Sequence, residues 1–183
     1  MEDRSSYIQF HVPLNRRAQW YHDLTASLDG VKSVKWQNGF FHITAAFVND
    51  KIGFVEANRI AEILNEELLG ITAPIIDFDT LDAFATQGGG TIVVYLTASR
   101  VSEQWEALID RIRTRLKGSG YDLGPYRMHV TLARIPAGSI DLEELRHRIS
   151  RIIIPRMTMS LTKADYRFFK EFKCAVREWE FPL

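Results

Sequence analysis

Two short stretches of this sequence repeat one chemical pattern. Residues 41–47 read FHITAAF and residues 128–134 read MHVTLAR, so each stretch holds a histidine and a threonine, one residue apart, inside an apolar run. Alternate side chains of a β-strand point to the same face. The histidine and threonine of each stretch are therefore expected on one face. The apolar residues, Phe47 included, are expected on the opposite face, where a core can cover them.

His42 with Thr44, and His129 with Thr131, would form two halves of a phosphodiesterase site if their strands met across a cleft. Histidine titrates near neutral pH, so one imidazole can be a neutral base while the other is a charged acid. The threonine hydroxyls can donate hydrogen bonds to the non-bridging phosphate oxygens, where negative charge lies in the transition state. One His-x-Thr in a strand is most often a structural accident, but two copies with the same facial pattern favour catalysis.

This chemistry needs neither a metal ion nor a cofactor, and we predict neither. No Asp or Glu immediately flanks either histidine, and the sequence offers no convincing third ligand for zinc. Cys174 is the only cysteine, so an intrachain disulfide and a cysteine-based zinc site are both excluded.

Length and charge limit the class of partner. A chain of 183 residues suits one compact domain. The 23 basic and 23 acidic side chains balance, whereas a non-specific nucleic-acid binder has a clear basic excess. A nucleotide or an RNA end, which needs only a local cluster of positive charge, is therefore a better ligand than a long duplex. The charged start at residues 1–4 and the lack of any run of about 18 apolar residues predict a cytoplasmic protein without a membrane span. We expect a monomer.

Apolar periodicity and turn residues predict an α+β chain with mainly antiparallel strands. Strands are expected at 7–12, 31–36, 40–48, 74–84, 91–98, 127–135, 157–168 and 174–181. Helices are expected at about 15–28, 53–69, 102–117 and 141–151. The turn signal at 37–39 predicts a hairpin between the second and third strands. Asp141, three residues before Glu144, stands in N-cap position for the last helix. The order of strand, helix and histidine-bearing strand occurs twice, which indicates a weak internal repeat of elements.

At its two motifs the sequence resembles the 2H phosphoesterase superfamily, especially the branch of 2′-5′ RNA ligases and RNA 2′,3′-cyclic phosphodiesterases. HVTLAR at 129–134 matches the second motif of that family almost verbatim, and VKW at 34–36 stands where the family has Val-Arg-Trp. The closing EFPL at 180–183 is also similar. Two departures are the AAF at 45–47, where Leu-Ala-Phe is usual, and the QNG at 37–39 in place of a proline-rich approach.

The resemblance implies a bilobal, pseudo-symmetric fold in which two mainly antiparallel sheets form a central cleft with helices outside. Residues 1–183 would be a single domain of two interleaved lobes with no separable linker. The implied activity opens 2′,3′-cyclic phosphate ends of RNA or nucleotides to 2′-phosphates, with 2′-5′ RNA ligation as a side activity. We assign His129 as base and His42 as acid, and near-symmetry makes these roles easy to exchange. Two alternatives stay open: a nucleotide-binding module without turnover, and a phosphodiesterase for another small cyclic phosphate or a 2′-5′ oligonucleotide.

Two further residues are candidates for substrate binding. Arg134 matches the arginine that follows the second motif in the family and contacts phosphate, although strict alternation would place it opposite His129. A twist at the strand end would be needed to bring it to the cleft. Tyr7 falls on the polar face of the first strand, which lies beside the cleft in the family, and it could stack on a base. His11 shares that face but has no threonine partner, and a surface or packing role is favoured.

Overall fold

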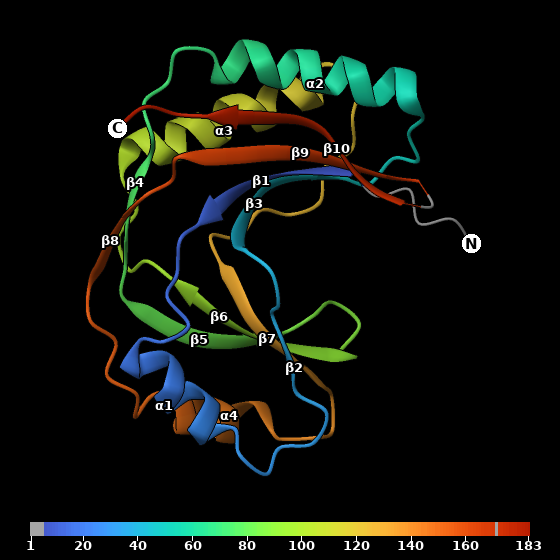
Figure 1. The fold of residues 1–183 in the computed structure, drawn as a ribbon. Helices are drawn as coiled ribbons and strands as arrows, with labels where there is room; N and C mark the ends of the chain where they lie inside the picture. Colours follow the sequence, from blue (N-terminus) through green and yellow to red (C-terminus); the bar gives the residue numbers. More distant parts are fainter. Residues whose placement is uncertain (1–5, 171) are drawn as a thin grey trace.

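The computed structural model describes residues 6–170 and 172–183, so the charged start at 1–4 lies outside the described residues, as does the side chain of Cys174 (Figure 1). The strands are β1 (Ser6–Val12), β2 (Lys35–Trp36), β3 (Phe41–Val48), β4 (Ile75–Phe78), β5 (Thr80–Ala85), β6 (Thr91–Thr97), β7 (Val130–Pro136), β8 (Met157–Ser160), β9 (Lys163–Lys170) and β10 (Phe172–Glu180). The helices are α1 (Gln19–Ser27), α2 (Phe54–Leu68), α3 (Glu103–Gly118) and α4 (Leu142–Ile149). None of these four helices is long and apolar enough to cross a bilayer.

The sheet has two halves that meet at one bridge. The first lobe contains the strands β10-β9-β1-β3, and the second contains β7-β6-β5 with β2 beside β7. Within each lobe, all adjacent strands pair in the antiparallel direction. The halves join where Ile43 of β3 pairs with Val130 of β7. A separate ribbon of β4 and β8 runs along one side between the lobes (Figure 1). The expected α+β class with antiparallel strands is confirmed, and the two expected sheets are the two halves of one eight-stranded sheet.

The helices lie on the outer faces of the two lobes. In Figure 1, α2 and α3 cover the first lobe, while α1 and α4 cover the second. The order β1-α1-β3-α2 is repeated as β6-α3-β7-α4. In each repeat the helix between the two strands packs on the opposite lobe, so the lobes exchange α1 and α3. The expected repeat of elements is therefore present, and it places the two histidine-bearing strands at the centre.

One continuous core extends through both lobes because each element buries one apolar face. The inward face of α3 carries Trp105, Ile112 and Leu116 at helical spacing. The ring of Trp105 lies edge-on to Phe10 of β1, with ring centroids 5.0 Å apart, and both side chains are almost completely buried. Truncating either ring to alanine would cost about 3–5 kcal/mol of stability.

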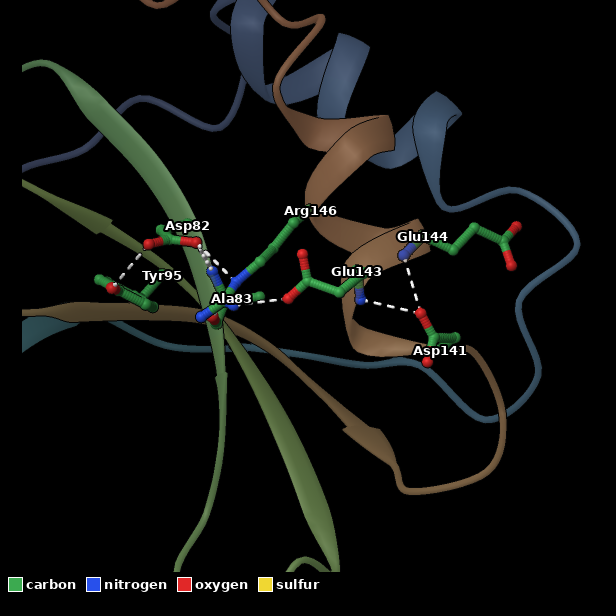
Figure 2. A network of polar contacts seen from close by, with 7 residues as sticks. All are labelled: Asp82, Ala83, Tyr95, Asp141, Glu143, Glu144 and Arg146. Atoms are coloured by element: carbon green, nitrogen blue, oxygen red, sulfur yellow. Dashed lines mark hydrogen bonds and ion pairs between the residues drawn. The ribbon is translucent and has the colours of Figure 1, made fainter.

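Asp141 caps α4 as its sequence position predicts. Its Oδ1 accepts hydrogen bonds from the backbone N–H groups of Glu143 at 3.0 Å and Glu144 at 3.1 Å (Figure 2). Such a cap contributes about 1 kcal/mol to stability.

The sequence pattern was wrong about one strand partner and about the extent of two strands. The predicted hairpin of 31–36 with 40–48 does not form, because β2 pairs with β7 of the second lobe. The predicted strand 74–84 is divided into β4, which pairs with β8, and β5, which pairs with β6. The predicted strand 157–168 is likewise divided between β8 and β9. In the last two cases the chain passes from one sheet to another inside an apolar run, and local periodicity carries no information on the partner strand.

Candidate active site

Strand β3 contains one extra residue directly after its motif threonine. Between Thr44 and Ala46, the register advances two residues on β3 but only one on β1, so Ala45 is a β-bulge. An inserted residue reverses the alternation of faces beyond it. Phe47 therefore joins the face that carries the histidine, and the expectation that it lies on the apolar face is wrong. Its ring is 39% exposed and lines a cavity.

Strand β7 has the same irregularity at the equivalent place. Between Thr131 and Ala133, the register advances two residues on β7 but one on β6, so Leu132 is the extra residue. The reversed alternation brings Arg134 to the motif face, where it lines the same cavity as His42. Strict alternation would have placed Arg134 on the opposite face, and the bulge is the reason that it reaches the cavity.

A cavity of about 520 Å³ lies on the motif face of the first lobe. It is lined by Tyr7, Gln9, Gln37, Asn38, Gly39, Phe40, His42, Thr44, Phe47, Arg134 and Arg167. Four of the six site residues expected from the sequence are in this set. Burial raises the pKa of one of them, Tyr7, partly offset by the charge of Arg167.

The other two expected residues, His129 and Thr131, are not among the residues that line this cavity, but they lie at the start of the strand that meets β3. The Ile43–Val130 bridge aligns the two motifs in antiparallel register. If this register is extended by one residue in each direction, His42 lies opposite Thr131 and Thr44 lies opposite His129. The histidines are close enough for the charge of His129 to lower the pKa of His42. The observed strand begins later than the expected 127–135, so His129 stands one position before Val130, the first residue of β7.

His42 is held in its neutral form. Burial lowers its pKa to about 4, and the Phe40 backbone offsets part of that change. Smaller effects come from Asp165, which raises the pKa, and from the neighbouring histidines His11 and His129, which lower it. Nδ1 of His42 has no contact with solvent and makes no hydrogen bond of normal geometry within the described part of the chain. The imidazole can therefore accept a proton but is seldom charged before substrate binds.

His129 has a fixed tautomer. Its Nδ1–H donates a hydrogen bond of 2.9 Å to the carbonyl oxygen of Arg127, which leaves Nε2 for proton transfer. Phe84 and Tyr95 hold the ring edge-to-face, with centroids 5.5 and 5.9 Å away. Burial lowers the pKa of His129, the hydrogen bond to Arg127 opposes this change, and the charges of Arg127 and Arg134 add to it. The shift is smaller than that of His42.

A buried carboxylate beneath the cavity was not foreseen. Asp165 of β9 has no exposed surface. It accepts hydrogen bonds from Gln9 Nε2 at 2.8 Å, from His11 Nε2 at 2.9 Å, and from Arg167 Nε and Nη2, both at 3.2 Å. Burial opposes ionisation of this carboxyl, but the hydrogen bonds from His11, Arg167 and Gln9 hold its pKa below the usual value. Asp165 is therefore an anion that fixes His11 and two side chains that line the cavity, Gln9 and Arg167.

His11 is part of this cluster and is the cross-strand partner of His42. Its ring stacks on Phe40, with centroids 3.9 Å apart and planes inclined by 16°. The role predicted for His11 from the sequence, at the surface or in packing, agrees with the ring stacking but does not include the hydrogen bond to Asp165. A signal existed in the sequence of β9, where Asp165 and Arg167 alternate with buried apolar residues.

The second lobe has a polar row like that of the first. Thr131 pairs with Tyr95 of β6, and Tyr95 pairs with Asp82 of β5. Figure 2 shows the Tyr95 hydroxyl donating to Asp82 Oδ2 at 3.4 Å, and Arg146 Nε of α4 lying 3.3 Å from Asp82 Oδ1. In each lobe the order is therefore a motif threonine, a polar side chain on the next strand and a carboxylate on the strand beyond.

An arginine from outside the cavity orders its rim. Arg16 Nη2 donates to the carbonyl oxygens of Gln37 at 2.9 Å and Gly39 at 2.6 Å, and its guanidinium carbon lies 4.0 Å from the ring centroid of Phe41. Gly39 has φ of 73°, a conformation that favours glycine. Arg16 thus positions the 37–39 loop that stands where the resembled family has prolines. Among residues 6–170 and 172–183, no group of three or more His, Cys, Asp or Glu side chains is placed to hold a metal ion.

Solved structures with this architecture align with nearly the whole chain. No protein-family model matches the sequence, and no curated protein is significantly similar to it. E. coli LigT complexed with 3′-AMP has 16% identity and a TM-score of 0.66, with 100% of both chains covered. Usb1 of Kluyveromyces marxianus with uridine monophosphate has 8% identity and a TM-score of 0.62, covering 98% of this chain and 99% of Usb1. A crystal structure of a phosphoesterase has 13% identity and a TM-score of 0.63, covering 98% of this chain and 99% of the other.

The chain has the fold of the 2H phosphoesterases. The expectation of this fold, drawn from the two His-x-Thr motifs, is confirmed. In this chain the fold brings the two motif strands together at the Ile43–Val130 bridge. TM-scores of 0.62–0.66 establish this architecture, whereas identities of 8–16% leave the chemistry to be argued from the side chains.

Proposed function

We propose that this protein is a phosphodiesterase that opens 2′,3′-cyclic phosphate ends of RNA or nucleotides to 2′-phosphates, with His42 and His129 as its acid–base pair. The observation that carries the proposal is the Ile43–Val130 bridge, because it aligns the second motif with the first motif, whose His42 and Thr44 line the cavity. Arg134 adds a cation on the same cavity, as an anionic substrate requires.

The reaction is a single displacement at phosphorus. One neutral imidazole takes a proton from water, and the water oxygen forms a bond to phosphorus as the bond from phosphorus to O3′ breaks. The other imidazole, which is charged, gives its proton to O3′. The products are a 2′-phosphate and a free 3′-hydroxyl. A 5′-hydroxyl in place of water would give 2′-5′ ligation through the same transfers. Thr44, Thr131 and Arg134 are assigned to the non-bridging oxygens.

The pKa values favour His42 as the base and His129 as the acid, which reverses the order assigned from the sequence. Burial holds His42 neutral with a pKa of about 4, so it is ready to accept a proton at any pH above that value. The pKa of His129 is lowered less, and its Nδ1–H keeps a hydrogen bond to a carbonyl in the charged form. An anionic phosphate in the site raises both values by attraction, and His129 charges first.

Nucleotide ligands in structures of the same fold support this choice of substrate. LigT was solved with 3′-AMP, with ATP and with NADP⁺, and Usb1 with uridine monophosphate. The cavity of about 520 Å³ is within the range of small-molecule sites.

The test is turnover of adenosine 2′,3′-cyclic phosphate by the full chain, with the product compared against authentic 2′- and 3′-phosphates. We expect the 2′-phosphate alone. His42→Ala and His129→Ala should each lower the rate by about 10²-fold or more and keep the melting temperature near that of the wild type. His22→Ala, at an exposed position on α1, is the matched control.

Full activity in either motif variant would overturn the mechanism. Tight nucleotide binding by the wild type without turnover of cyclic mononucleotides, oligonucleotides with cyclic ends or 2′-5′ dinucleotides would identify a binding module instead. The intact histidine and threonine pairs favour turnover.

A further inference from the structure

Arg167 is a cation on the cavity that comes from a strand without a motif. Its strand, β9, lies beyond β1 from the motif strand β3 (Figure 1). Arg167 nevertheless lines the same cavity as His42 and Thr44, and its side chain is 24% exposed. Arg134 reaches this cavity from β7 of the second lobe. The cavity therefore has a guanidinium from each lobe, and the reaction proposed above assigns a role to Arg134 alone.

The guanidinium of Arg167 is held in place by two contacts. Its Nε and Nη2 each donate a hydrogen bond of 3.2 Å to Asp165, and its carbon lies 5.0 Å from the ring centroid of Phe40. Asp165 is itself fully buried and is fixed by Gln9 and His11. A side chain that is already ordered loses little conformational entropy when a ligand binds. Arg167 is thus preorganised as a binding group.

The contact with Asp165 leaves one edge of the guanidinium for a ligand. Arginine has five N–H donors in a rigid plane, and the carboxylate uses one on Nε and one on Nη2. Both donors of Nη1 and the second donor of Nη2 lie along the other edge, where no acceptor is found among residues 6–170 and 172–183. Two parallel N–H groups of this kind match the oxygens of a phosphate. Because Asp165 offsets the charge, a singly charged phosphodiester suits this edge.

The register places this edge about one nucleotide away from the first motif. Asp165 pairs with Gln9, and Gln9 pairs with Thr44. Two strand spacings separate the backbones of Asp165 and Thr44 by about 10 Å. Asp165 and Arg167 share a strand face, so the guanidinium lies on the cavity side of this row. The span is comparable with the separation of neighbouring phosphates in a strand of RNA together with the reach of a guanidinium.

We propose that Arg167, anchored by Asp165, binds the phosphodiester on the 5′ side of the nucleotide whose cyclic phosphate lies at the motifs. This inference rests on the proposed function and narrows it, because the substrate is then the end of an RNA strand rather than a free cyclic mononucleotide. Contact with a single backbone phosphate needs no basic surface. It is therefore consistent with the balance of 23 basic and 23 acidic side chains.

The experiment compares two diadenosine substrates that both end in a 2′,3′-cyclic phosphate. One has a phosphodiester between its nucleosides, and the other has a neutral methylphosphonate, so bases and length are matched. The wild type should prefer the phosphodiester in kcat/KM by about 10-fold or more, the least that a hydrogen bond to a charged group contributes. Arg167→Met should bring the ratio to within about twofold of unity. Arg167→Lys should keep part of the preference, since it restores the charge without the fork.

The ratio is measured within each variant, so a loss of folded protein or of kcat that affects both substrates cancels. Arg100→Met, which removes an exposed arginine between β6 and α3, is the matched control and should keep the wild-type ratio. Arg134→Met should lower both rates and keep the ratio, because its assigned contact is the cyclic phosphate. A ratio lost in Arg134→Met and kept in Arg167→Met would overturn the inference.

A wild-type ratio of one, with both substrates turned over, would also overturn it and would leave the proposed function intact. If neither substrate is turned over, the proposed function has failed, and the subsite is judged by binding of the corresponding dinucleotides with a 2′-phosphate end. The wild type should then bind the phosphodiester at least about fivefold more tightly than the methylphosphonate, and Arg167→Met should remove the difference. Equal affinities in the wild type would contradict the inference without reference to catalysis.

Discussion

Phe47 and Arg134 occupy equivalent positions in the two lobes, each five residues after a motif histidine and each on the cavity. Both reach that face because one extra residue, Ala45 or Leu132, follows the motif threonine. A strand without the bulge would turn the phenyl ring and the guanidinium toward the core. The cavity thus acquires an apolar contact from one lobe and a cation from the other through a repeated backbone irregularity.

Removing the charge of Arg134 should weaken catalysis far more than folding. Arg134→Met is expected to lower kcat/KM by about 10- to 100-fold, because a hydrogen bond to a charged group contributes roughly 1.5–3 kcal/mol. Arg134→Lys should recover part of this loss by restoring the charge without the forked geometry. Steady-state kinetics on a cyclic nucleotide provide the measurement. Arg148→Met, on the exposed face of α4, should leave kcat/KM unchanged. Equal losses in both methionine variants would show that Arg134 has no specific role.

The pH profile of kcat/KM should be bell-shaped and displaced to the acid side of the histidine reference value. The acid limb falls where His42 gains a proton, near pH 4, because the protonated ring cannot act as base. The alkaline limb falls where His129 loses its proton, below the usual 6.5, because burial lowers that pKa also. The limbs of kcat should lie at higher pH, since a bound phosphate raises both pKa values.

Rates from pH 3.5 to 9 on one cyclic nucleotide would measure these limbs, which belong to the coupled pair rather than to either residue. A monotonic rise of kcat/KM to pH 9, with chemistry rate-limiting, would exclude the two-histidine mechanism.

Asp165→Asn should destabilise the protein by roughly 2–4 kcal/mol. The substitution removes the negative charge of the buried carboxylate, so the side chains that donate hydrogen bonds to it lose their charged partner. Asp165 is fully buried and contacts Gln9, His11 and Arg167. Urea unfolding would give the free-energy difference. Asp110→Asn, at an exposed position on α3, should change stability by less than about 0.5 kcal/mol. A change at Asp165 as small as the control would mean that the cluster contributes little to folding.

Activity should survive chelation. The proposed transfers use imidazoles, hydroxyls and a guanidinium, and none of these steps involves a metal ion. The rate after dialysis against EDTA should equal the untreated rate within experimental error. If EDTA abolished turnover and zinc or manganese restored it, the reaction would proceed by metal-assisted hydrolysis instead. Heat-treated protein in the same buffers corrects for background hydrolysis.

Much of the architecture could be derived from local patterns in the sequence. The four helices lie close to their predicted ranges, because each has an apolar stripe ended by turn residues. Partner strands were less predictable. Strand β2 joins the second lobe, and the apolar run from 74 to 84 divides between two sheets. Each strand carries its own period of two, but the choice of neighbour depends on packing over the whole chain.

At the site, the sequence alone determined the two His-x-Thr motifs and the chemistry they can perform, because residue type and alternation are local properties. Only the tertiary structure decided which residues after each motif lie on the same strand face as its histidine and threonine. Phe47 reached the cavity against its expected alternation, since a bulge is a property of a strand and its neighbour together. The contact of His11 with Asp165 joins residues 154 positions apart, and no local signal couples them. The low pKa of His42 likewise arises from burial, which distant elements of the fold create around it.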